Sequence, residues 1–142
     1  MSLLSLLSDR HLPYSDKHPA LIPWQTDSDG LYPRLLRLHP ENAGITGVGG
    51  VYLLWHQGSE ARWIYAGRSK DLSRSIATAR DSSTVLVFEP DGGVYVTWAP
   101  ILPEYQSGVV RYLKETLSPL IQEDLDGGTN PNAEPIPVLP PG

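Results

Sequence analysis

Prolines confine regular secondary structure to the middle of this chain. Five prolines lie between Leu12 and Gly50, and the residues after Asp126 are again rich in proline and glycine. Each proline removes a backbone hydrogen-bond donor and restricts the residue before it, so long helices or strands are not expected at either end. With 14 Pro and 13 Gly in 142 residues, the composition favours a small α+β domain over a helical bundle.

This distribution divides the chain into three parts. We predict a Pro-rich N-terminal arm with short helices over residues 1–49, an α+β domain over 50–122 and a Pro/Gly-rich C-terminal arm, or tail, over 123–142. In the N-terminal arm, four leucines between residues 3 and 7 fit one face of a short helix, and residues 31–38 favour one or two helical turns. The tail is expected to be extended.

The domain begins with two strand-like runs. Residues 51–55 and 62–66 are rich in β-branched and aromatic side chains, and the turn between them contains Gly58, so they predict an antiparallel hairpin. Both runs are apolar enough to be expected in the middle of a sheet. After them, Ser69 is expected to cap a helix of about three turns, whose apolar face includes Leu72 and Ile76.

Two more elements complete the predicted domain. Residues 84–89 and 94–99 flank a Pro-Asp-Gly-Gly turn, which predicts a second hairpin. Apolar residues from Val109 to Leu117 then predict an amphipathic helix that begins near Gln106 and stops before Pro119. Together these elements predict an α+β fold with a small, mainly antiparallel sheet and flanking helices.

Composition also limits the function classes. No apolar run approaches the roughly 20 residues that cross a bilayer, so no membrane partner is expected. The absence of cysteine excludes disulfides and thiolate metal sites. The four histidines lack metal-like spacing, and no cofactor is expected. The first residues lack the features of a secretory signal, which makes the cytoplasm the expected location.

One short segment is basic within an acidic chain of net charge -5. Residues 62–80 hold a single acid, Asp71, and five basic residues: Arg62, Arg68, Lys70, Arg74 and Arg80. Such a segment is typical of either a phosphate-binding surface or a solvated helix face. The acidic total opposes non-specific DNA affinity. A protein partner or self-association is therefore favoured, and nucleic-acid binding through residues 62–80 is the alternative.

The two strand-like runs also carry a motif. Gly50-Val51-Tyr52, then twelve residues, then Tyr65-Ala66-Gly67 and Arg68-Ser69-Lys70-Asp71-Leu72, resembles the signature of the GIY-YIG nuclease family, which includes homing endonucleases. The resemblance covers residues 49 to 122. It implies metal-assisted phosphodiester hydrolysis by two tyrosines on the sheet, an arginine on the next helix and a glutamate on a later helix that holds one divalent metal.

Two parts of that implied site match this sequence. Tyr52 and Tyr65 occupy the tyrosine positions, and Gly67 occupies the position where the backbone turns under the site. The family arginine position, ten residues after the second tyrosine, is Ser75. The neighbouring Arg74 would serve only if the helix entry were shifted by one residue.

The metal site matches less well. The family glutamate position, nine residues before Pro119, is Val110, which shares the apolar face of Leu113. Glu115 is expected to pair with Arg111 one helical turn earlier. Without an acid in the site, no metal ligand is predicted, because Mg²⁺ needs at least one or two carboxylates.

The matched tyrosine positions and the missing arginine and glutamate predict a site that has lost catalytic residues. Tyr52, Tyr65 and Arg74 would be vestigial catalytic residues, and the predicted binding residues are Gly67, Arg68, Lys70, Arg62 and Arg80. The protein would act as a protein-binding or nucleic-acid-binding module. The alternative is an active Mg²⁺- or Mn²⁺-dependent DNA endonuclease that uses Arg74 or Arg68 and a glutamate elsewhere. An acidic side chain close to both tyrosine hydroxyls would favour that alternative. A third reading takes the Leu-rich start and both Pro-rich ends as docking arms in a larger assembly.

Overall fold

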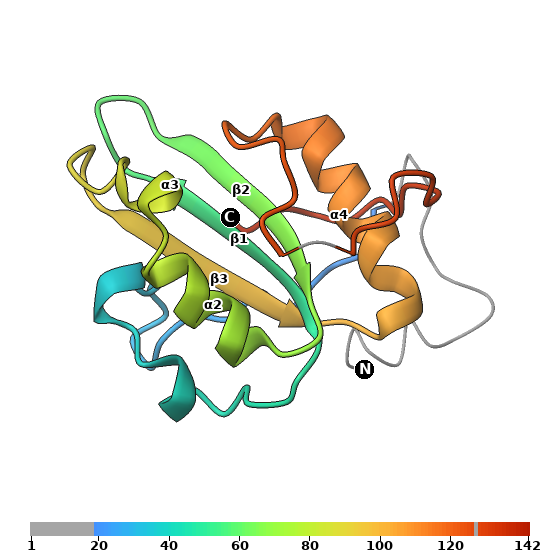
Figure 1. Cartoon of the computed structure of the whole chain (residues 1–142), viewed down its shortest axis with the longest axis horizontal. Helices are drawn as coiled ribbons and strands as arrows, with labels where there is room; N and C mark the ends of the chain where they lie inside the picture. Colours follow the sequence, from blue (N-terminus) through green and yellow to red (C-terminus); the bar gives the residue numbers. More distant parts are fainter. Residues whose placement is uncertain (1–18, 127) are drawn as a thin grey trace.

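The computed structural model describes residues 19–126 and 128–142 (Figure 1). The predicted helix around residues 3–7 lies outside these residues. The described part has a three-stranded antiparallel sheet of order β2-β1-β3 and several helices. Its elements are η1 (Leu35–Arg37), η2 (Pro40–Asn42), β1 (Gly50–His56), β2 (Arg62–Ser69), α2 (Leu72–Arg80), α3 (Ser83–Leu86), β3 (Val94–Pro100) and α4 (Pro103–Leu117). The predicted α+β class with a small antiparallel sheet is confirmed.

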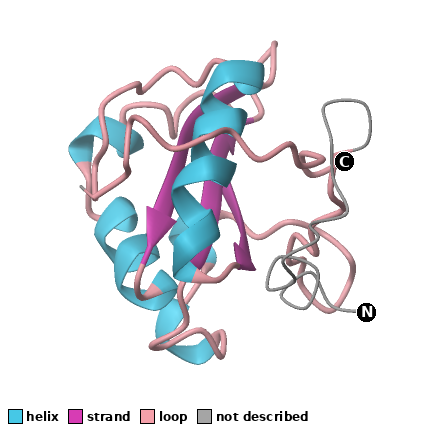
Figure 2. Cartoon of the chain, turned by 90° about the vertical axis from the view of Figure 1, so that its right-hand side faces the viewer, coloured by secondary structure: helices cyan, strands magenta, loops and turns pink. Residues whose placement is uncertain are grey.

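Helices α2 and α4 cover opposite faces of the sheet, and Figure 2 shows α4 crossing in front of the strands. Successive strand residues point to opposite faces. Val51 and Leu53 therefore pack toward α4, whereas Tyr52 and Leu54 pack toward α2. All seven residues of β1 are buried, which explains why this strand is apolar on both faces.

The prediction that both hairpin strands are central is wrong for β2. Strand β1 pairs with β2 on one side and with β3 on the other, so β2 lies at an edge. Its outer side is covered by the chain after α4: the Leu120 N–H donates to the Trp63 carbonyl at 3.1 Å, and the Ile121 N–H donates to the Ile64 carbonyl at 2.8 Å. Because residues 120–121 cover its outer side, β2 is as buried as a central strand would be, which explains its apolar composition.

The predicted second hairpin is also wrong. Residues 83–86 form the helix α3 and not a strand. The Gly93 N–H donates to the Glu89 carbonyl, so the glycine-rich turn connects a helical segment to β3. The N-terminal arm already occupies the outer side of β3. Arg34 forms an antiparallel β-bridge with Tyr95, and the Val96 N–H donates to the Pro33 carbonyl at 3.1 Å. Among the described residues, the N-terminal arm therefore takes the place beside β3 that a second hairpin strand would need.

Both long helices begin elsewhere than predicted. Asp71, not Ser69, is the N-cap of α2, and its carboxylate accepts from the Arg74 N–H; Ser69 still ends β2 and its hydroxyl accepts from the Asp71 N–H at 3.0 Å. Helix α4 begins at Pro103, since proline is well suited to a first helical turn.

The arm and the tail contribute to the core on the α4 side of the sheet. Ala20 and Ile22 from the arm and Ile136 and Val138 from the tail are buried in one cluster with residues of β1 and α4. Ala20 also forms a parallel bridge with Val138. Within the described residues, no helix has the length and apolarity needed to cross a membrane.

Candidate functional site

Tyr52 and Tyr65 lie side by side on the α2 face of the sheet, with ring centroids 5.7 Å apart. Across the β1–β2 ladder, Tyr52 is opposite Gly67 and Tyr65 is opposite Leu54. Gly67 leaves room for the neighbouring ring, because a Cβ atom there would lie 2.5 Å from Cε2 of Tyr65. The predicted pairing of the two tyrosines is therefore confirmed, and Gly67 shapes their packing.

Each tyrosine hydroxyl is paired with a carboxylate from residues 123–126, which we call the acidic segment. The Tyr52 hydroxyl donates to Asp126. The Tyr65 hydroxyl donates to Oδ1 of Asp124 at 3.1 Å and accepts from the Leu125 N–H at 3.0 Å. Sequence reasoning missed both acids because it searched α4 for the acidic partner.

Burial and these acids raise the pKa of both tyrosines above its usual value. Burial is the largest cause for each, followed by the negative charge of Asp126. Both hydroxyls therefore favour the protonated form near neutral pH and act as hydrogen-bond donors to the two acids.

The two acids differ in proton affinity. The pKa of Asp126 is raised, chiefly by burial and further by the negative charge of Asp124. The hydrogen bond from Tyr52 acts in the opposite direction but does not outweigh them. Burial also acts to raise the pKa of Asp124, but hydrogen bonds outweigh that effect and the pKa is lowered. Those bonds include one from the Thr129 N–H to Oδ2 at 2.9 Å and one from Tyr65.

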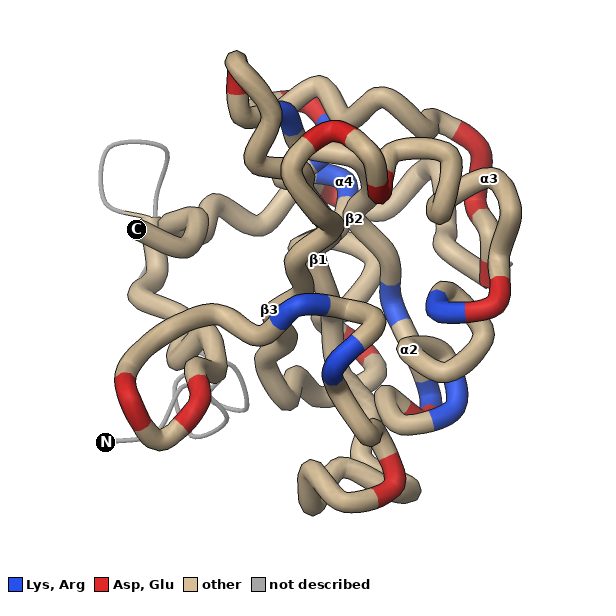
Figure 3. The backbone as a smooth tube through the Cα atoms, turned by 90° about the vertical axis from the view of Figure 1, so that its left-hand side faces the viewer, with Lys and Arg blue, Asp and Glu red and all other residues tan. Residues whose placement is uncertain are grey.

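A basic pocket of about 600 Å³ adjoins the acidic segment. Three of the five predicted basic residues line it, together with hydroxyl-bearing side chains and the edge of the tail. The residues that define it are Arg68, Ser69, Lys70, Asp71, Arg74, Ser75, Thr78, Asp126 and Gly128. Basic positions of α2 appear in blue in Figure 3. Because Lys70 and Arg74 are exposed, their charges are available to a ligand.

Arg68 is held in place from two sides. Its Nε donates to Oε1 of Gln106 at 3.1 Å, and its Nη1 donates to the Gly128 carbonyl at 2.7 Å. Gln106 is fully buried, and its Nε2 donates to the Ile101 carbonyl at 2.8 Å. The sequence carried one signal for this role: Gln106 is a polar residue on the otherwise apolar face of α4, one turn before Val109 and Val110.

The other two basic residues lie apart from the basic pocket. Arg62 is at the opposite end of β2, beside Trp63. Arg80 donates through Nη2 to the Leu36 carbonyl at 3.0 Å. Of the five basic residues in segment 62–80, three therefore line the basic pocket and the other two lie at separate places.

The position implied for the metal-binding glutamate is buried away from the tyrosines. Val110 is fully buried with Leu113 in the cluster between α4 and the sheet, on the opposite face from Tyr52. Glu115 forms the expected pair with Arg111, at 3.1 Å. Across residues 19–126 and 128–142, no group of three or more His, Asp or Glu side chains could hold a metal ion.

Comparison of the chain with protein-family models, curated proteins and solved structures finds no match.

Proposed function

We propose that this chain is a non-catalytic binding module with a GIY-YIG-like domain, and that it holds the phosphate groups of a nucleic-acid strand in the basic pocket. The gathering of Arg68, Lys70 and Arg74 around one pocket is the observation that carries this proposal. Cationic side chains and hydroxyls are the groups that proteins use most often to bind phosphate oxygens.

Local charge supports an anionic ligand despite the acidic total. The three cations outnumber the two carboxylates at the pocket, Asp71 and Asp126. The carboxylate of Asp71 also accepts from the backbone N–H groups of Gly47 and Arg74, so it serves mainly as a helix cap. A phosphate would therefore meet a net positive surface.

The tyrosines do not offer a platform for bases in this arrangement. Tyr52 and Tyr65 are 1% and 0% exposed, and the acidic segment accepts hydrogen bonds from their hydroxyls. Recognition through the basic pocket alone would use the phosphate backbone, which carries no sequence information. Binding is therefore expected to be insensitive to sequence.

Salt dependence of binding to a labelled single strand tests this proposal. Three phosphate contacts predict a log-log slope of about -2, because each contact to single-stranded nucleic acid contributes about -0.7. Arg74→Glu should weaken binding and make that slope shallower. Arg37→Glu is the matched control, since Arg37 is exposed on η1 and does not line the basic pocket.

Two results would contradict the proposal. One is the absence of binding at about 50 mM salt, where electrostatic affinity is strong. The other is equal weakening by Arg74→Glu and Arg37→Glu, which would show that binding responds to total charge and not to the basic pocket.

A Mg²⁺-dependent endonuclease is the second candidate, and the acidic side chains at both tyrosine hydroxyls favour it. Asp126 accepts from the Tyr52 hydroxyl and also lines the basic pocket with Arg74. One or two protein carboxylates can be sufficient to bind Mg²⁺ when substrate phosphate supplies further ligands. Cleavage of plasmid or branched DNA with Mn²⁺ tests this candidate, and both Asp126→Asn and Tyr52→Phe should abolish it.

A further inference from the structure

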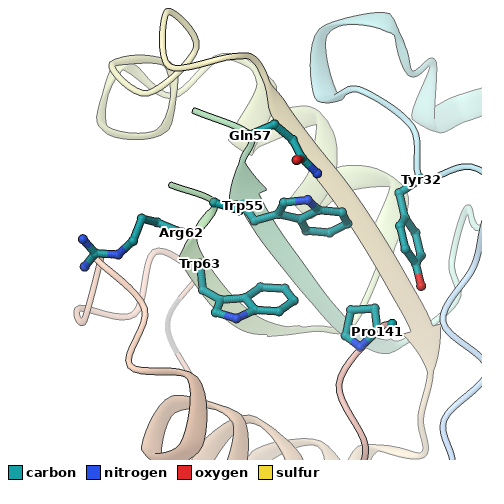
Figure 4. Close-up of a pocket in the computed structure, with 8 residues that line it drawn as sticks. Tyr32, Trp55, Gln57, Arg62, Trp63 and Pro141 are labelled. Carbon is teal, nitrogen blue, oxygen red and sulfur yellow. The ribbon is translucent and has the colours of Figure 1, made fainter. Parts of the chain in front are cut away.

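A second pocket lies at the other end of β1 and β2 from the basic pocket, and aromatic rings line it. Tyr32, Trp55 and Trp63 surround a space of about 250 Å³, with Gln57 and Arg62 at its rim (Figure 4). The Tyr32 and Trp55 rings meet at 86° with centroids 5.2 Å apart, and Trp55 and Trp63 meet at 62° and 5.6 Å. These rings contact one another edge to face and form a continuous aromatic lining, and we call the pocket that they line the aromatic groove.

The chain places a proline of its own against this groove. The Leu139 N–H donates to the Ala20 carbonyl at 2.9 Å, and the Trp24 indole donates to the Leu139 carbonyl at 2.8 Å. These two bonds fix the backbone just before Pro140 and Pro141. Pro141 then forms one wall of the aromatic groove, and Figure 4 shows it facing the same space as the rings.

The chemistry of the groove matches a polyproline II segment. Such a segment has no internal hydrogen bonds, so its carbonyls are free to accept from donors, and its rings pack on aromatic faces. Here the accessible aromatic surface comes mainly from Trp63 and Tyr32, because Trp55 is 7% exposed. The exposed amide of Gln57 supplies donors at the rim, whereas the Arg62 guanidinium points away from the rings (Figure 4).

We propose that the aromatic groove is a docking site for a proline-rich segment of a partner protein in the polyproline II conformation. The partner segment packs on Trp63 and Tyr32 in the space beside Pro141, which acts as a wall built from the same kind of residue. This site lies apart from the basic pocket, so it gives the protein a second binding surface that does not depend on nucleic acid.

Titration of the full chain with a labelled polyproline peptide of about ten residues tests this proposal. Binding should appear as a rise in anisotropy and as shifts of the Trp55 and Trp63 indole N–H resonances. A Gly/Ser peptide of equal length should give neither change. Trp63→Ala should weaken the peptide at least about tenfold, as expected for a tryptophan that anchors an interface.

Two further variants keep the test independent of folding. Gln57→Ala changes an exposed side chain at the rim, so it should weaken binding about threefold without altering the melting temperature. Pro141→Gly should weaken binding because it removes one wall, whereas Pro131→Gly, at an exposed tail proline outside the groove, should not. Arg74→Glu should also leave polyproline affinity unchanged.

Two outcomes would overturn the proposal. The first is polyproline affinity that is the same for the wild type, Trp63→Ala and Gln57→Ala. The second is concentration-dependent dimerisation that Trp63→Ala abolishes, in a wild type that binds no polyproline; this result would assign the groove to a second copy of the chain.

Discussion

Replacing Tyr65 by phenylalanine removes one oxygen atom and should release the acidic segment from the sheet. That oxygen makes two hydrogen bonds to the segment, one to the Asp124 carboxylate at 3.1 Å and one from the Leu125 N–H at 3.0 Å. A bond to a charged group contributes about 1.5–3 kcal/mol and a neutral one about 0.5–1.5 kcal/mol. Asp124 is half-buried and water can replace its partner, so we expect the lower bound, about 2 kcal/mol.

This loss should appear as local opening and not as a collapse of the fold, because the aromatic ring of Tyr65 still fills its place in the core. Native-state hydrogen exchange followed by mass spectrometry measures the opening. A change of about 2 kcal/mol corresponds to roughly 30-fold faster exchange in the acidic segment. Exchange in β1 should change much less.

Tyr105→Phe provides the matched control. Tyr105 is half-buried on α4, and within the described residues its hydroxyl makes no hydrogen bond. This variant should leave exchange in the acidic segment unchanged. If Tyr65→Phe also leaves that exchange within about twofold of the wild type, the two hydrogen bonds do not hold the segment and the reasoning fails.

Two more predictions concern burial and pH. Ile64→Ala should lower the free energy of unfolding by about 2–5 kcal/mol in a denaturant titration, because Ile64 is fully buried on β2; a loss below about 1 kcal/mol would mean that Ile64 is not packed in the core on the α2 side of the sheet. Exchange protection of the acidic segment, corrected for intrinsic rates, should pass through a maximum with pH. The contribution of Asp126, whose pKa is raised, is lost as pH rises through that pKa, whereas that of Asp124, whose pKa is lowered, is lost as pH falls through it. Asp126→Asn should remove the loss at higher pH, and a variant that retains this loss would assign it to another group.

Local patterns were sufficient to predict β1, most of β2 and the two long helices. They failed where a distant segment decided the outcome. Residues 84–89 have strand-like composition, but Pro33 and Arg34 occupy the outer side of β3. Similarly, β2 looked central because residues 120–121 cover its outer side. Neither contact follows from the composition of the strand itself.

The candidate site was predictable to the same extent. The tyrosine pair follows from the hairpin register, since both side chains point to one face. The acids that meet the pair lie 59 residues after Tyr65 and 74 residues after Tyr52, in a loop with no periodicity that could relate it to the sheet. The only sequence signal was the spacing of Asp124 and Asp126, two acids on alternate residues just after Pro119.

The joining of arm and tail on the α4 side has a consequence for synthesis of the protein. Ala20 and Val138 pair with each other, although they are separated by nearly the whole described sequence. Because Ile136 and Val138 follow the sheet and α4 in the chain, the apolar surface around Val109 stays uncovered during synthesis until these last residues are available. Such long-range closure also slows folding. The newly made chain would therefore be most exposed to aggregation in the interval after α4 forms and before residues 136–138 pack on the sheet.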